Sequence, residues 1–199
     1  MGRGRHRRPW PGLRSSWAGF TLLEILFVTV LMCVLMAIAI PQMLTGIDRS
    51  RGLAAARYLA SRMALARAQA AGRSTIVALW FQQESRGVTF GIVQDGNRNG
   101  VRTKDIQLQI DRLIEAPLVL SDLFPGVDIG LAPQTPGVDA VQLGESNLLS
   151  FSPAGTSSSG TVYVRGRDGT QWAVRVLGAT ARARVLRYVP LTREWVYAS

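Results

Sequence analysis

The feature that most constrains this chain is an apolar segment that begins immediately after a basic leader. From Phe20 to Ile40 the only charged residue is Glu24. At 1.5 Å of rise per residue, a helix over this segment is about 31 Å long, which matches the hydrocarbon thickness of a bilayer. The segment is longer than the apolar part of a secretory signal peptide, so we expect a transmembrane helix.

The leader predicts the orientation of this helix. Five arginines and no acidic residue precede Gly19, and they supply half of the net charge of +10: Arg3, Arg5, Arg7, Arg8 and Arg14. Basic residues beside a membrane span remain in the cytoplasm. The remainder of the chain is therefore expected on the exported side. The single cysteine, Cys33, lies in the span, so no disulfide within the chain is expected.

Glu24 requires a physical reason, because a carboxylate in a membrane span costs on the order of 2.5 to 3.5 kcal/mol near the helix centre and less toward an end. It lies one helical turn, about 6 Å, after Phe20. Cleavage after Gly19 would create a positively charged amine on Phe20. Glu24 of one subunit could then neutralise the amine of a neighbouring subunit within a helix bundle. The alternative is a carboxylate that extends to the lipid headgroups.

The segment Gly19-Phe20-Thr21-Leu22-Leu23-Glu24, followed by the apolar run and Pro41, resembles the N-terminal signal of type IV pilins and type II secretion pseudopilins. The resemblance implies that a prepilin peptidase of the inner membrane cuts after Gly19 and methylates Phe20. It also implies that Glu24 docks subunits and that Pro41 kinks the long helix.

Two later segments narrow the resemblance to the GspH/FimT branch of this family. Residues 59–70, LASRMALARAQA, are similar to the helix of that branch, and Phe151-x-Pro153-x-Gly155 is similar to a late strand entry. The implied partners are other pilins or pseudopilins, the prepilin peptidase and the inner-membrane assembly platform. The implied location is the inner membrane, with a cytoplasmic N-terminus and a periplasmic domain, followed by a periplasmic pseudopilus or a surface pilus.

The pattern of the chain predicts four regions. They are a leader at 1–19, a transmembrane helix at 20–40, an amphipathic helix at 41–72 and a β-rich exported domain at 73–199. Apolar residues recur on one face of the second helix at Leu59, Met63, Ala66 and Ala70. The arginines on its other faces, Arg57, Arg62 and Arg67, are predicted to be solvated, and Gly72 is predicted to end the helix.

After Gly72 the pattern changes to that of strands. Residues 106–113 alternate between apolar and polar side chains and are predicted to form a strand. The other predicted strands cover residues 75–82, 88–93, 118–120, 148–151, 161–165, 171–176, 184–189 and 194–197. One long helix followed by short strands predicts an α+β fold, with an antiparallel β-domain packed on the C-terminal half of the helix.

An oxygen-rich loop, Asp95-Gly96-Asn97-Arg98-Asn99-Gly100, matches the start of a calcium-binding loop through Asp95, Asn97 and Asn99. An EF-hand would place a glutamate where the chain has Ile106. Asn-Gly between two strands is also a strong signal for a hairpin turn. The turn is the favoured interpretation and calcium is the alternative.

Arginines alternate near the C-terminus at Arg182 and Arg184, which places both on one face of a strand. A basic face attracts phosphates without sequence preference. Some FimT-like minor pilins that act in DNA uptake carry Gly-Arg-x-Arg here, whereas this chain has Ala181 in place of the glycine. A solvated strand edge or a contact with an acidic subunit is the favoured interpretation, and DNA binding is the alternative.

Catalysis is not expected. The only histidine, His6, lies in the leader, so a nucleophilic triad in the exported domain would lack its usual base. Aromatic strand residues are assigned to the core or to interfaces, without a ligand: Trp80, Trp172, Trp195, Tyr163 and Tyr197. The sequence therefore predicts a non-enzymatic, cofactor-free subunit of a secretion pseudopilus or a type IV pilus. The alternatives are a DNA-binding minor pilin and an unprocessed membrane anchor for a binding domain.

Overall fold

The computed structural model describes residues 19–131, 139–144 and 146–198, without the side chains of Pro41 and Leu44. The chain divides into two compact units, residues 1–42 and residues 43–199. The predicted leader lies outside the described residues apart from Gly19. A single helix, α1 (Leu22–Arg73), contributes its first part to one unit and the rest to the other.

The second part of α1 buries the face that the sequence predicts. Leu59, Met63, Ala66 and Ala70 are all buried, because the strands that follow pack against them. The helix ends one residue later than predicted. Arg73 is its last residue, and Ser74 rather than Gly72 takes the left-handed conformation after it, with φ of 52°.

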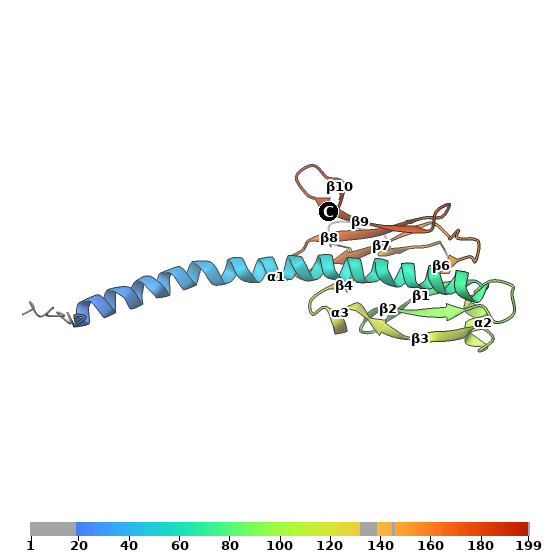
Figure 1. Cartoon of the computed structure of the whole chain (residues 1–199), viewed down its shortest axis with the longest axis horizontal. Helices are drawn as coiled ribbons and strands as arrows, with labels where there is room; N and C mark the ends of the chain where they lie inside the picture. Colours follow the sequence, from blue (N-terminus) through green and yellow to red (C-terminus); the bar gives the residue numbers. More distant parts are fainter. Residues whose placement is uncertain (1–18, 132–138, 145, 199) are drawn as a thin grey trace, which may run out of the picture. The chain divides into compact units, whose positions relative to one another are not determined.

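The strands form two antiparallel sheets (Figure 1). The first has the order β3-β2-β1-β6, and its strands are β1 (Val77–Glu84), β2 (Gly87–Gln94), β3 (Arg112–Val119) and β6 (Leu148–Phe151). The second has the order β10-β9-β8-β7-β4, with β5 also paired to β7. Its strands are β4 (Asp128–Ile129), β5 (Val141–Gln142), β7 (Gly160–Arg165), β8 (Gln171–Leu177), β9 (Arg182–Val189) and β10 (Glu194–Tyr197). The helices α2 (Thr103–Gln107) and α3 (Leu120–Leu123) flank β3 in the sequence.

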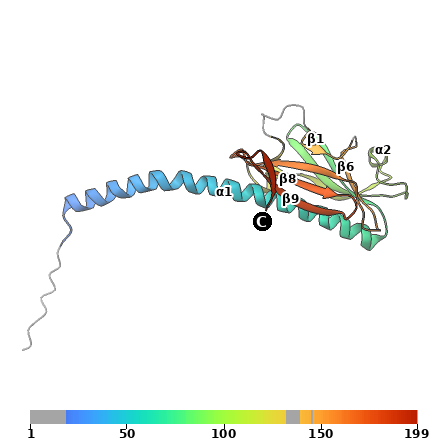
Figure 2. The same cartoon turned by 90° about the horizontal axis from the view of Figure 1, so that it is seen from above.

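One hydrophobic core joins the helix to both sheets. It contains Leu59 and Met63 from α1, Phe81 from the first sheet and Val174 from the second, all of them buried. Figure 2 shows β8 and β9 running along the C-terminal part of α1. The predicted α+β fold, with an antiparallel β-domain on this part of the helix, is confirmed.

The predicted strand at residues 106–113 is wrong. The segment begins in α2, passes through an irregular stretch and reaches β3 only at Arg112. Its alternating residues do not face a core, since Leu108 and Ile110 are exposed. Instead the backbone closes a local turn, in which the N–H groups of Ile110 and Asp111 both donate to the carbonyl of Asp105.

The Asp95 loop is held by carboxylates that accept backbone hydrogen bonds. Asp95 accepts the N–H groups of Asn97, Arg98 and Gly100 at 3.1, 2.7 and 2.9 Å. The side-chain amides of Asn97 and Asn99 donate to Asp105. Asp111 accepts the N–H groups of Gly96 and Arg102, both at 3.0 Å. These bonds satisfy the buried carboxylates as a structural turn would, so the loop has a physical explanation without a metal ion.

Arg62 is not the solvated residue that its position on the helix predicts. Its guanidinium forms an ion pair with Glu115 of β3, and both side chains are largely removed from solvent. The pair therefore connects α1 to the edge strand of the first sheet. Arg57 is exposed, as predicted.

Candidate functional site

The Gly19–Phe20 bond lies just before the first turn of α1. Thr21 caps the helix: its hydroxyl accepts the N–H of Glu24 at 3.2 Å, and its carbonyl accepts the N–H groups of Glu24 and Ile25. Phe20 is 77% exposed, and a methyl group added at Gly19 would meet nothing within 4 Å. No steric constraint within the described structure therefore requires a glycine at position 19.

Glu24 is the third residue of α1 and is exposed. A negative charge in the first turn interacts favourably with the helix dipole. Within the residues that the structure describes, the Glu24 carboxylate has no hydrogen-bond or ion-pair partner. Its charge is therefore available to a group outside this copy of the chain.

The apolar residues that follow are exposed on all sides of the helix. Every described side chain from Phe20 to Ile40 is exposed. By length and composition α1 is also the one described helix that could cross a membrane. A helix that is apolar all round must be covered by lipid or by other helices. This segment can therefore be covered either by lipid or by neighbouring helices.

Pro41 falls inside α1, which the backbone assignment continues without a break. Proline removes one hydrogen-bond donor from a helix and disfavours the straight geometry. The kink expected at Pro41 remains a prediction.

The two C-terminal arginines lie together on β9. Arg182 and Arg184 are both exposed, and Arg175 of β8 is the register partner of Arg184. Arg184 donates to the Tyr197 hydroxyl at 2.8 Å, and its guanidinium lies 5.4 Å from the centre of that ring. This outer face of the second sheet is positively charged at three neighbouring positions.

An aromatic cluster lies on the same sheet. The rings of Tyr163 and Tyr188 lie 5.4 and 5.2 Å from the ring of Trp195. Trp172 is instead buried in the core, at 3% exposure. The expectation that strand aromatics lie in the core or at interfaces thus holds for Trp172 in the core, and an interface role of Trp195 remains a prediction. The cluster itself could not be read from the sequence, because it depends on the register of β7, β9 and β10.

The calcium alternative at Asp95, Asn97 and Asn99 remains a prediction. Among the described residues, no group of three or more His, Cys, Asp or Glu side chains is arranged to hold a metal ion. His6 lies outside the described part of the chain.

The N-terminal cap that Thr21 forms on α1 was not predicted from the sequence. The signal was present, because Thr-x-x-Glu before an apolar run is the pattern of a capping box. The same four residues, Thr21 to Glu24, belong to the processing motif, so one sequence pattern carries both a helix start and a candidate docking charge.

Comparison with known proteins supplies the family. The family model for the type II transport protein GspH matches residues 55–180, which is more than half of the chain. Comparison with curated protein sequences gives no match. Among solved structures, the minor pseudopilin EpsH from the type 2 secretion system of Vibrio cholerae matches with a TM-score of 0.44 and 12% identity. That match covers 69% of this chain and 97% of the other.

The matched residues include the buried face of α1 and the strands β1 to β8, and they leave out the apolar run and the last two strands. The chain belongs to the family of type II transport proteins GspH.

Proposed function

We propose that this chain is a minor pseudopilin that assembles into the pseudopilus of a type II secretion system. The observation that carries the proposal is the exposed apolar start of α1 with Glu24 in its first turn, in a chain of the GspH family. The β-domain would stay outside the helix bundle and contact other subunits or cargo. No step of this function requires catalysis or a cofactor.

In the proposed mechanism the inserted chain is cleaved after Gly19, and Phe20 becomes the methylated N-terminus. The exposed position of the bond before the first turn of α1 supports access by a peptidase. The new ammonium group of one subunit then pairs with Glu24 of another. Inside an apolar bundle either charge alone would be costly, so pairing removes the penalty of both and fixes the axial register.

The first test is the mass of the mature protein. In cells with an active prepilin peptidase we expect a chain that begins at Phe20 with one added methyl group. Gly19→Glu should block this processing without affecting the β-domain, because nothing contacts a side chain at position 19. A wild-type chain that retains the leader would refute the proposal and favour an unprocessed membrane anchor.

The second test concerns the docking charge. Glu24→Gln keeps the size and the Thr21 cap, which uses the backbone N–H of residue 24. We therefore expect normal membrane insertion and normal cleavage, but strongly reduced incorporation into filaments. Thr29→Val, a change within the same apolar run, is the matched control and should assemble normally. Equal assembly of the Gln variant and the wild type would refute the proposed role of Glu24.

A type IV pilus, with DNA bound by the basic face of β9, is the second candidate function. The neighbouring positions of Arg182, Arg184 and Arg175 favour it, together with nearby aromatic rings that could stack on bases. Double charge reversal at Arg182 and Arg184 should then abolish DNA retention and spare filament assembly. Charge reversal at the exposed Arg86 is the matched control. Unchanged DNA retention in the double variant would exclude this function.

A further inference from the structure

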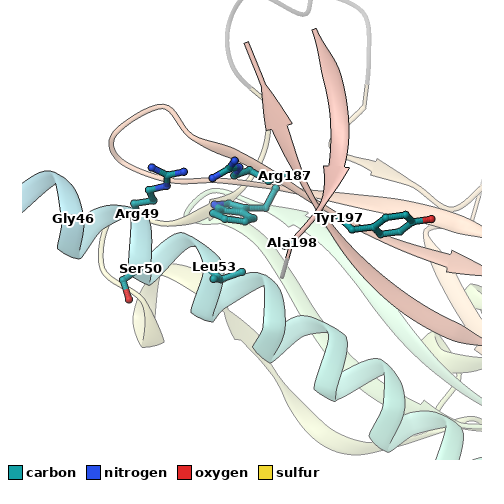
Figure 3. Close-up of a pocket in the computed structure, with 8 residues that line it drawn as sticks. Gly46, Arg49, Ser50, Leu53, Arg187, Tyr197 and Ala198 are labelled. Carbon is teal, nitrogen blue, oxygen red and sulfur yellow. The ribbon is translucent and has the colours of Figure 1, made fainter. Parts of the chain in front are cut away.

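A basic pocket opens between residues 46–53 of α1 and the strands β8, β9 and β10. It has a volume of about 360 Å³, and its lining includes Arg49, Ser50, Trp172, Arg187 and Tyr197. Figure 3 shows Arg49 and Arg187 on the strand-facing side of α1. None of the lining residues is acidic. The pocket therefore concentrates two positive charges and no negative one.

The two arginines reach the pocket from different elements. Arg187 is the register partner of Trp172, so it lies on the helix-facing side of the second sheet. Arg182 and Arg184 lie five and three residues earlier, on the opposite face of the strand. The pocket and the candidate DNA surface thus use opposite faces of β9, and Tyr197, which accepts a hydrogen bond from Arg184, borders both.

Neither pocket arginine is neutralised by the described part of the chain. The nearest acidic residue in sequence, Asp48, pairs with Arg51 at 3.4 Å. No hydrogen bond or ion pair joins Arg49 or Arg187 to another described side chain. Two unpaired guanidinium groups in one concave site are suited to a ligand with several acceptor oxygens, because each offers a planar fork of donors.

The turn of the β9–β10 hairpin exposes one large apolar side chain, Leu191. Arg182 lines a groove with Ala64 and Ala71 of α1, whereas Arg187 lines the pocket with Gly46 and Leu53. From Arg182 to Arg187, the strand β9 thus runs along α1 toward the N-terminal end of that helix. Figure 1 shows the turn between β9 and β10 extending further in that direction, and its Leu191 is 96% exposed.

The part of α1 that lines the pocket follows the apolar run closely in the sequence. After Glu24, the first charged residues of the chain are Asp48 and Arg49. Arg49 lies nine positions after Ile40, so as helix it follows the apolar run by at most about 14 Å. Arg49 is therefore the first cation beyond the apolar run on the exported side of an inserted helix.

From these observations we propose that the pocket formed by Arg49 and Arg187 binds the phosphodiester headgroup of an anionic phospholipid before the subunit leaves the membrane. This inference rests on the proposed function, because it requires the apolar run to be inserted in a bilayer. The exposed Leu191 supports a lipid over a soluble phosphate, since an exposed apolar side chain four residues after Arg187 suits the boundary between headgroups and acyl chains. The bound lipid would hold the β-domain against the membrane until assembly begins.

The test uses the full-length chain in nonionic detergent, titrated with phosphatidylglycerol or with phosphatidylcholine and followed by native mass spectrometry. We expect the wild type to retain phosphatidylglycerol and Arg49→Gln combined with Arg187→Gln to bind it at least tenfold more weakly. The matched control combines Arg86→Gln with Arg112→Gln, two exposed arginines outside the pocket. It has the same net charge and the same leader arginines, so it should bind within twofold of the wild type.

Equal affinity of the pocket variant and the control would overturn the proposal, and so would equal retention of phosphatidylcholine. Displacement of the lipid by inorganic phosphate as effectively as by soluble dihexanoyl phosphatidylglycerol would reassign the pocket to free phosphate. Loss of secretion in the pocket variant with unchanged lipid binding would reassign it to a partner subunit, and the lipid proposal would again be wrong. Cleavage after Gly19 and filament incorporation are measured in the same variants. They test the proposed function independently of the pocket.

Discussion

Gly52 offers a sharp test of how α1 packs, because two physical effects of Gly52→Ala have opposite signs. Alanine in the interior of an exposed helix stabilises it by up to about 1 kcal/mol relative to glycine. At position 52, however, the added methyl group would lie 2.7 Å from Nε1 and 3.3 Å from Cδ1 of Trp172. Trp172 is held in the core at 3% exposure and cannot move away freely.

Forcing a methyl group into a filled core costs typically about 1 to 3 kcal/mol. Subtracting a helix gain of up to about 1 kcal/mol leaves Gly52→Ala with a net destabilisation of about 0 to 3 kcal/mol. Gly72→Ala is the matched control, since position 72 also lies in α1 and its added methyl group would meet nothing within 4 Å. We expect that variant to be unchanged or more stable by a few tenths of a kcal/mol, as its place in the last turn limits the gain.

The assay is urea unfolding of the full-length chain in detergent, followed by far-UV circular dichroism and tryptophan emission. Trp172→Ala removes the Cδ1 and Nε1 atoms and should relieve the clash, so the double variant with Gly52→Ala should show a favourable coupling free energy. A Gly52→Ala variant more stable than the wild type, with no coupling to Trp172→Ala, would refute the packing described here.

Three further predictions concern stability. Removing either partner of the Arg62–Glu115 ion pair should cost about 1 to 3 kcal/mol, and a double-mutant cycle by urea unfolding should show that the two changes are coupled; additive effects would contradict the pair. Asp95→Ala should cost about 1 to 3 kcal/mol, because three backbone N–H groups lose their acceptor, and hydrogen exchange should accelerate at Asn97, Arg98 and Gly100; unchanged exchange there would refute the turn. Leu59→Ala should cost about 2 to 5 kcal/mol in the same unfolding assay, whereas Leu65→Ala, on the exposed side of α1, should cost less than about 1 kcal/mol; equal costs would contradict the buried face.

Local patterns in the sequence predict those parts of the fold that depend on residues close to one another in the sequence. The buried face of α1 at Leu59 and Met63 follows from helical periodicity, and β6 and β10 begin and end at the predicted residues. The fold class follows from the same patterns, since one helix and a series of short strands can bury their apolar faces only by packing together.

The errors arise where partners distant in the sequence decide the structure. Residues 106–113 alternate like a strand, but the Asp105 carbonyl and the Asp111 carboxylate accept backbone N–H groups, one of them from Gly96, and close a turn instead. Arg62 lies on a polar face of α1, yet the placement of Glu115 on β3 withdraws it from solvent. The pocket between Arg49 and Arg187 likewise depends on strand register, which no single segment specifies.

The apolar run carries the only thiol of the chain, Cys33, and that thiol is exposed on its helix. A maleimide dye can therefore be attached at one defined point without any mutation. A charged, water-soluble reagent would react slowly while acyl chains surround this point and at a different rate once neighbouring helices replace them. Under the proposed function, the native chain thus contains its own reporter for the transfer from lipid to filament, readable over time in living cells.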